Sequence, residues 1–434
     1  MSFPFFRQDV SIPGMLNKAR RCFEKIPGSP GCDIPLVDHL MSGLALFGLK
    51  YPSLLQFDSD SRNETTQANL RALYGVERVP SDTYFRECLD GVDPYELRPL
   101  YKALLGALQR AKGLEGFAFL DGHYLLSLDG TGYFSSKKIH CEQCGEKHHR
   151  DGTTTYYHQM LGAVLVHPDS REVFALAPEP ILKQDGAKKN DCERNAAKRL
   201  LMDLRREHPH LKLIVIEDAL ASNAPHIRLL KELDLRFILG AKQSDHTFLF
   251  DWVEQTSTTC EYALTDEKGI HHRFRYLDAA PLNEANFDLQ VNFLEYWETT
   301  PDGKATHFAW VTDIPLNESN LMQLMRGGRA RWKIENETFN TLKNQGYHFE
   351  HNFGHGEKNL STVLMHLMML AFLIDQIQQR CCRLFQAAVA VAQTKTRFWR
   401  KLRNRFDLCL IPDWETLYRS IIRPPPIDLG YDTS

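Results

Sequence analysis

Residues 124 to 240 carry strand and helix signals in an order that few folds share. Apolar runs bounded by turn residues predict strands. The predicted strands are residues 124–128, 156–167, 172–177, 213–216 and 236–240. Amphipathic spacing predicts two helices between them, at 190–207, where Asn190 can act as the cap, and at 224–233. Three strands, a helix, a strand, a helix and a strand indicate an α/β fold built on a mixed sheet.

Two of these predicted strands end in an aspartate. Asp129 follows the run 124–128 and is followed by Gly130, a turn residue. Asp218 follows the aliphatic run 213–216, which has the composition of a strand buried on both faces. A strand that ends in an acid and turns into a helix presents its carboxylate at the carboxyl edge of a sheet. The two aspartates are therefore candidates for one site; an ordinary α/β domain with two unrelated acids is the alternative.

A third candidate acid, Glu335, lies in a predicted helix over 331–343. Arg331 is one turn before it, so the two side chains would share a face. Trp332 and Phe339, seven residues apart, would form an apolar seam beside that charged face. A carboxylate held on a helix and flanked by Arg and Lys suits a site that binds a metal ion and a phosphate together. A surface row of ion pairs is the alternative.

The three acids, in this order and within this series of elements, resemble the site of DDE transposases from bacterial insertion sequences. The resemblance is to the cut-and-paste kind, whose RNase H-like core is interrupted by a β insertion. The matching segments are Leu-Asp-Gly-Thr at Asp129, Ile-Glu-Asp-Ala at Asp218 and Arg-Trp-Lys-Ile-Glu at Glu335. The acids lie 89 and then 117 positions apart, and the resemblance covers residues 120–375.

The predicted Glu335 helix departs from the family pattern at two positions. The family carries a Tyr seven residues before the Glu, where this chain has Gly328. The Lys expected seven residues after the Glu comes one later, at Lys343, which is about 80° off the Glu335 face at roughly 3.6 residues per turn. Glu337 is therefore a rival for the third acid, although the Arg-Trp-Lys-Ile-Glu match favours Glu335.

The resemblance implies a two-metal site. In the RNase H-like fold the first and fourth strands are neighbours, so Asp129 and Asp218 would lie side by side, and Glu335 would join them. Carboxylate oxygens suit Mg²⁺ or Mn²⁺, and two such ions can activate the attacking oxygen and stabilise the leaving one. Arg331 and Lys343 would then hold phosphate oxygens.

The implied activity is hydrolysis of DNA at the ends of the element, followed by joining of the 3′-OH ends to target DNA by transesterification. The expected partners are transposon-end and target DNA and further copies of the chain, and we expect no membrane. One alternative is another RNase H-like DNA nuclease, such as a resolvase. The other is a catalytically inactive DNA-binding relative.

The chain divides into five expected parts. These are a helical N-terminal domain that could bind DNA (1–118), the first part of the core (119–243), a β-rich insertion (244–325), the second part of the core with the Glu335 helix (326–378) and a basic C-terminal helix and tail (379–434). The strands expected in the insertion are 246–253, 260–264, 272–277, 290–297 and 307–312. The apolar run 360–374 is too short for a membrane span and predicts a buried helix.

The distribution of charge along the chain indicates one local DNA contact, although the protein as a whole is not basic. With 52 Lys and Arg against 55 Asp and Glu, the net charge is −3. Residues 395–405, however, contain six basic residues and no acid, interleaved with Phe398 and Trp399. Such a run is typical of phosphate-backbone contact, and a solvated helix face is the alternative. The expected contacts are Arg397, Arg400, Lys401 and Arg403.

The cysteines suggest a reducing compartment and a zinc site. Ten cysteines without an export signal favour the cytoplasm, with the protein associated with the bacterial nucleoid. Cys141 and Cys144 form a Cys-x-x-Cys pair followed by His148 and His149, which together could bind structural Zn²⁺. The histidine ligands stay open among His140, His148, His149 and His158. A reduced loop without metal is the alternative.

Overall fold

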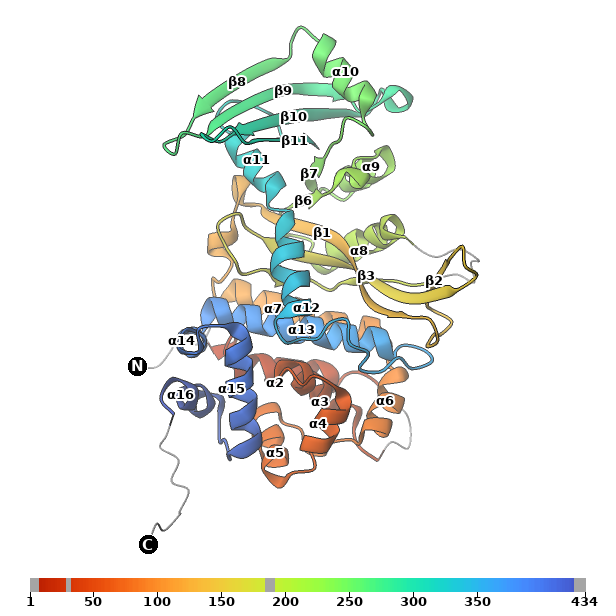
Figure 1. Cartoon of the computed structure of the whole chain (residues 1–434), viewed down its shortest axis with the longest axis vertical. Helices are drawn as coiled ribbons and strands as arrows, with labels where there is room; N and C mark the ends of the chain where they lie inside the picture. Colours follow the sequence, from red (N-terminus) through yellow and green to blue (C-terminus); the bar gives the residue numbers. More distant parts are fainter. Residues whose placement is uncertain (1–7, 29–32, 184–191, 425–434) are drawn as a thin grey trace.

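The computed structural model describes residues 8–28, 33–183 and 192–424. Figure 1 shows three layers along the long axis: a β-rich layer at one end, a mixed α/β core in the middle and a body of helices at the other end. Helix α11 and the helical segments after it run from the β-rich layer past the core to the helical body. The candidate acids lie in the middle layer.

The core sheet has the strand order of the RNase H-like fold. Its strands are β1 (Tyr124–Ser136), β3 (Thr154–Val166), β4 (Phe174–Ala175), β5 (Glu179–Ile181), β6 (Leu213–Glu217) and β7 (Arg236–Gly240). Strands β1, β6 and β7 are parallel neighbours, and β3 pairs antiparallel with β1. The short β4 and β5, together with β2 (Gly145–His148), line the other edge of β3. The predicted mixed sheet with flanking helices is therefore confirmed.

Two helices make the crossovers between the parallel strands. Helix α8 (Glu193–Glu207) precedes β6, and α9 (Ala224–Glu232) connects β6 to β7 after the short turn η5 (Ala219–Ala221). The predicted apolar face of α8 is buried. Asn190, the predicted cap, lies outside the described residues. Asn223 caps α9, because its side chain accepts a hydrogen bond from the His226 amide and Pro225 follows in the first turn.

The insertion extends the core sheet rather than forming a separate one. Its elements are α10 (Thr247–Gln255), β8 (Cys260–Thr265), β9 (His271–Pro281), η6 (Glu284–Asn286), β10 (Gln290–Thr299) and β11 (Ala305–Thr312). Strand β11 pairs antiparallel with β7, which gives the order β2-β3-β1-β6-β7-β11-β10-β9-β8. The strand predicted at 246–253 is wrong: this segment forms α10, because Leu249, Phe250 and Val253 follow helical spacing and bury one face.

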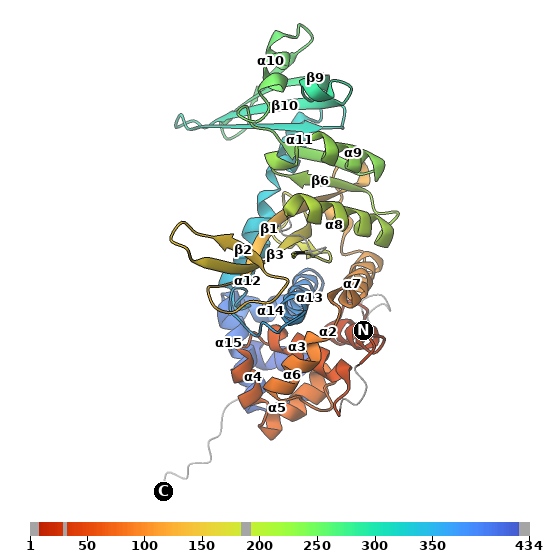
Figure 2. The same ribbon diagram turned by 90° about the vertical axis from the view of Figure 1, so that its right-hand side faces the viewer.

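Helices from both ends of the chain form one body (Figures 1 and 2). The first group is α2 (Ile12–Phe23), α3 (Leu36–Gly48), α4 (Leu54–Asp60), α5 (Glu64–Asn69), η1 (Leu70–Tyr74), α6 (Asp82–Asp90), η2 (Pro94–Leu97), α7 (Arg98–Arg110), η3 (Glu115–Phe117) and η4 (Leu120–Gly122). The second group is α13 (Leu360–Cys381), α14 (Arg383–Ala392), α15 (Lys395–Leu408) and α16 (Trp414–Ile422). A buried ion pair of 2.7 Å between Lys50 and Asp375 joins the two groups.

Helix α13 is the central helix of the protein. Its 22 residues are apolar enough to cross a membrane by length and composition, yet 94% of its most apolar window is buried inside the protein. It packs against α3 on one side and β4 on the other. The Tyr101 hydroxyl donates to the His366 carbonyl at 2.9 Å within this packing. The buried helix predicted at 360–374 is thus confirmed and continues to Cys381.

Candidate active site

The register of β1 and β6 sets Asp129 beside Asp218. The two strands pair in parallel from Tyr124 opposite Leu213 to Ser127 opposite Ile216. Continued for two more residues, the same register puts the two aspartates opposite each other at the carboxyl edge of the sheet, where parallel strands present polar groups. Each carboxylate also caps local backbone. The Gly130 amide donates to Asp129 at 3.0 Å, and the Leu220 amide donates to Asp218 at 2.9 Å.

Glu335 lies in a π-helical turn that packs on the strand carrying Asp129. Helix α11 (Leu321–Arg329) ends in a turn, and η7 (Ile334–Phe339) then leads into α12 (Asn340–Asn344). The Asn340 amide donates to the Glu335 carbonyl, five residues back. Single π turns within helices frequently mark functional sites.

The absence of a side chain at Gly162 lets η7 approach the sheet closely. Gly162 is on β3, directly opposite Asp129. A Cβ atom there would lie 3.1 Å from the Phe339 ring and 3.4 Å from Ile334, so a larger residue would push η7 away. On the neighbouring strand, the Ser127 hydroxyl donates to the Arg331 carbonyl at 3.1 Å. These contacts hold the Glu335 segment against β1.

The electrostatics indicate that the acids share one site. Burial raises the pKa of the Asp129 carboxyl, and the charges of Asp218 and Glu335 raise it further. The Arg331 guanidinium, 3.3 Å from the Asp129 carboxylate, opposes this shift. Glu335 of η7 is among the main charges that act on Asp129. Mutual repulsion of neighbouring carboxylates is the usual state of a cation site before the cation binds.

A fourth acid, Glu193, joins this cluster and was not among the predicted site residues. It is the first residue of α8, and its carboxylate lies so close to Gly130 that a Cβ atom at that glycine would collide with it. Burial raises the pKa of Glu193, and the charges of Asp129 and Asp218 add to the increase. From sequence, Glu193 was assigned only to the start of a helix. The available signal was an acid in the first turn of the helix that leads to the Asp218 strand.

The helix geometry gives Arg331 and Lys343 other neighbours than a regular helix would. Arg331 precedes the π turn and pairs with Asp129 on the sheet instead of sharing a helix face with Glu335. Lys343 pairs with Glu350 at 3.1 Å. A π turn holds about one residue more than an α turn. Lys343, the eighth residue after Glu335, therefore lies near the face that the seventh residue would occupy in a regular α-helix. The spacing departure in the sequence is therefore reduced by the local structure.

The apolar seam predicted for the Glu335 helix is only half present. Phe339 is buried, but Trp332 is 51% exposed, and the Arg331 guanidinium lies 4.6 Å from its ring centroid. The turn between α11 and η7 breaks the helical spacing and directs Trp332 to the surface. The glycine at position 328, where the family has Tyr, packs against the Trp310 indole. A Cβ atom there would overlap that ring, so this helix has no room for a tyrosine.

The basic helix α15 is partly structural. Phe398 and Trp399 are buried in the helical body, so they cannot contact DNA. Arg403 donates to the Lys50 carbonyl at 2.6 Å and lies over the Tyr51 ring, so its guanidinium also supports the helical body. The remaining three predicted residues are exposed on the other face of the helix. They are Arg397, Arg400 and Lys401.

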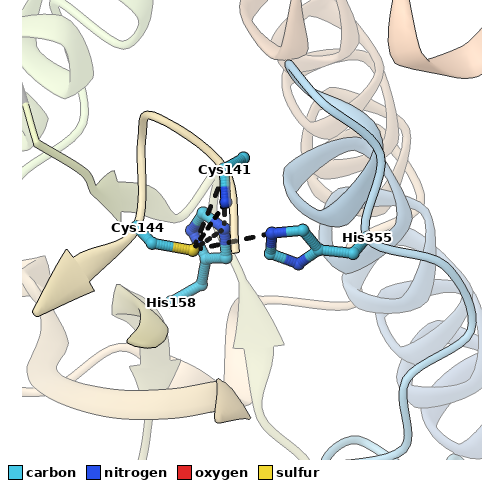
Figure 3. Close-up of side chains that lie close together, drawn as sticks. All are labelled: Cys141, Cys144, His158 and His355. Carbon is cyan, nitrogen blue, oxygen red and sulfur yellow. Dashed lines mark hydrogen bonds between the residues drawn. The ribbon is translucent and has the colours of Figure 1, made fainter. Parts of the chain in front are cut away.

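The Cys-x-x-Cys loop belongs to a Cys2His2 group that could hold zinc. Figure 3 shows Cys141 and Cys144 facing His158 of β3 and His355 from the loop before α13. The four ligand atoms lie within 4.8 Å of one another. His158 was one of the open alternatives, whereas His355 was missed because it is 211 residues from Cys144.

The two histidines that the sequence favoured as zinc ligands lie elsewhere. His148 and His149 contact the hydroxyls of Thr154 and Thr155, at 3.1 and 2.8 Å. The physical reason is the β2–β3 hairpin, which pairs His148 with Thr154. That pairing holds these rings beside the threonines on β3.

Comparison with known proteins finds distant similarity to solved structures. No protein-family model and no curated protein matches the chain. Among solved structures, the chain is similar to the piggyBac transposase in a synaptic complex with hairpin DNA. The two are 9% identical, with a TM-score of 0.42 over 98% of this chain and 83% of the other. A similarity at this level says nothing about the activity of this chain.

Proposed function

We propose that this protein is a DDE transposase that cleaves DNA and joins the 3′ ends to target DNA. The observation that supports the proposal is the electrostatic effect of Asp218 and Glu335 on Asp129. The β1–β6 register, continued by two residues, would set Asp129 and Asp218 opposite each other, and the charges of Asp218 and Glu335 both raise the Asp129 pKa. Carboxylates gathered at the carboxyl edge of an RNase H-like sheet suit metal-dependent phosphoryl transfer.

The donor set fits divalent magnesium or manganese. Asp129, Asp218 and Glu335 offer hard oxygen ligands, and Glu193 adds a fourth carboxylate nearby. When bound, two such ions would polarise the attacking and leaving oxygens of the phosphodiester. The raised pKa values of Asp129 and Glu193 support the fit, because a cation relieves the repulsion that causes part of the shift.

The side chains around the acids suit a phosphate backbone. Arg331 offers a planar donor group beside Asp129, and Lys343 on α12 adds a point charge. Trp332 presents half of its surface next to Arg331, so it could stack against a base or a sugar. Arg397, Arg400 and Lys401 would extend the contact on the helical body. Within the same proposal, the chain is cytoplasmic, stems from a bacterial insertion sequence and acts as a homo-oligomer on DNA.

The direct test of this function is a strand-transfer assay. The DNA flanking the gene should contain inverted repeats, and oligonucleotides that copy them serve as substrates. With Mg²⁺ or Mn²⁺, wild-type protein should cut at the repeat boundary and join the 3′ ends to a plasmid. Cutting without joining would favour another RNase H-like nuclease. Binding without cutting would favour an inactive DNA-binding relative.

A further inference from the structure

We propose that Cys141, Cys144, His158 and His355 bind one Zn²⁺ ion, which fastens the β1–β2 loop to the segment that precedes α13. The four ligand atoms come from three separate segments of the chain. This site is distinct from the carboxylate cluster, and its ligands are soft thiols and imidazoles instead of oxygens. The inference does not depend on the transposase proposal.

Four of the distances between ligand atoms match a tetrahedral zinc site. With Zn–S bonds of about 2.3 Å and Zn–N bonds of about 2.0–2.1 Å, a tetrahedron needs about 3.8 Å between sulfurs and about 3.6 Å between sulfur and nitrogen. The two sulfurs are 3.8 Å apart. The His158 Nε2 atom lies 3.5 Å from the Cys141 sulfur and 3.4 Å from the Cys144 sulfur. The His355 Nε2 atom lies 3.5 Å from the Cys144 sulfur.

Both histidine rings are buried with their Nε2 nitrogens facing the thiols. His158 and His355 are 1% and 7% exposed, and both direct Nε2 at the thiols. Their Nδ1 atoms are buried without a hydrogen-bond partner in the described part of the chain. Burying two imidazoles with only thiols for partners is costly, since thiols are weak hydrogen-bonding groups. A zinc ion between the four atoms would give the Nε2 atom of each ring a strong partner in place of a thiol.

The two cysteines are not joined by a disulfide bond. At 3.8 Å the sulfurs are far beyond the length of a disulfide bond, about 2.05 Å, and both cysteines are free. Thiolate is the form of cysteine that binds metal. Both sulfurs would be deprotonated in the zinc complex.

The surrounding structure holds His355 in place independently of the thiols. The Asp90 carboxylate accepts hydrogen bonds from four successive backbone amides, those of residues 357–360. Gly356 has a φ of +69°, and a side chain there would collide with Asp90. The Phe134 ring lies against His355, with centroids 4.3 Å apart. The fold therefore positions His355, the fourth ligand, as expected for a structural metal site.

The position of the cluster gives the ion a role in the protein. Strand β1 carries Asp129 and continues into the loop that holds Cys141 and Cys144. His355 follows α12, the continuation of the Glu335 segment. A closed site with four protein ligands leaves no position for a substrate, so this zinc would be structural. It would tie together the two segments that lead away from the acids.

Metal analysis of the purified wild-type protein is the first test. Protein prepared without chelators should contain about one zinc per chain, measured by inductively coupled plasma mass spectrometry. The Cys144→Ser and His355→Ala variants should lose at least about nine tenths of it. His149→Ala and Cys260→Ser are the matched controls, since both residues are exposed or half-exposed and lie outside the cluster; they should keep the full content.

A second measurement on wild-type protein guards against variants that do not fold. Removal of zinc by a chelator should speed backbone hydrogen exchange in residues 137–153 and 349–359, while helix α8 keeps its rate. Zinc-free wild-type protein that is folded and unchanged by added Zn²⁺ would overturn the proposal. So would full zinc in a folded His355→Ala variant, because the site needs its fourth ligand.

Discussion

Arg331 and Asp129, 202 residues apart in the sequence, form an ion pair with 3.3 Å between Nη1 and Oδ2. The guanidinium thus offsets one charge in a cluster that includes Asp218, Glu335 and Glu193. The Arg331 guanidinium lies where the neighbouring carboxylates favour a positive charge, beside the position proposed for the metal ions. Arg331 therefore both stabilises the protein before metal binds and is available to a phosphate afterwards.

Replacing Arg331 should separate these two roles. In Arg331→Gln the Asp129 carboxylate loses its partner, so the metal-free protein should be less stable by about 1 kcal/mol. Mg²⁺ should bind more tightly, because a competing positive charge is gone. Cleavage of DNA should nevertheless fall about 100-fold, as expected for losing a charged group aimed at the reacting phosphate. Thermal unfolding with and without Mg²⁺ and a cleavage assay check this. Weaker Mg²⁺ binding in the variant would contradict it.

The raised carboxyl pKa values predict how pH affects stability. Asp129 and Glu193 bind protons more tightly in the folded than in the unfolded state. Their contribution to stability is therefore present at low pH and is lost as pH rises through their folded pKa values. Divalent cations bind the deprotonated form, so Mg²⁺ should raise the Tm more at pH 7.5 than at pH 5. Scanning calorimetry on wild type and Glu193→Gln checks this. An equal Mg²⁺ effect at both pH values in the wild type would exclude it.

Glu193 should contribute to metal binding although it is not one of the three family acids. Glu193→Gln removes a charge next to Asp129 and Asp218. We expect cleavage to fall about 10- to 100-fold and the Mg²⁺ requirement to rise, as for groups that support a metal site. Glu254→Gln on the exposed face of α10 is the control and should behave like wild type. If Glu193→Gln shows the same Mg²⁺ dependence as the control, Glu193 serves only the fold.

The exposed face of α15 should bind DNA through charge alone. Replacing Arg397, Arg400 and Lys401 with Gln should weaken binding to all DNA sequences about equally. The slope of log affinity against log salt should fall by about 0.9 for each phosphate that the variant no longer neutralises. Arg403→Gln should instead lower the Tm and leave this slope unchanged, since Arg403 contacts Lys50 and Tyr51. Fluorescence anisotropy across a salt series measures both. An unchanged slope in the triple variant would show that the exposed face of α15 does not contact DNA phosphates.

Local signals in the sequence were sufficient for most of the core. Strand β6 is a run of aliphatic residues, and α8 has a clear apolar face, so both were predicted near their observed bounds. The strand prediction for residues 246–253 failed because a short apolar segment fits a strand or a helix equally well. The helical form of this segment depends on its packing, in which Phe250 contacts Phe293 of β10.

The parts of the sites that the sequence did not reveal depend on contacts between distant residues. The π turn at Glu335 is held against the sheet at Gly162 on β3, which no pattern within 331–343 indicates. Glu193 reaches Asp129 only through the crossover geometry of α8. His355 meets the Cys-x-x-Cys loop only after η7 has packed against β1.

The most direct test of the central claim is the number of Mn²⁺ ions bound when DNA is present. Wild-type protein with end DNA and its zinc site filled should bind two Mn²⁺ per chain, measured from the free-ion signal in electron paramagnetic resonance. Asp129→Asn, Asp218→Asn and Glu335→Gln should each lose at least one ion and abolish cleavage, whereas Glu337→Gln should bind two ions and cut. Two bound ions and near-normal cleavage in any of the first three variants would contradict the account.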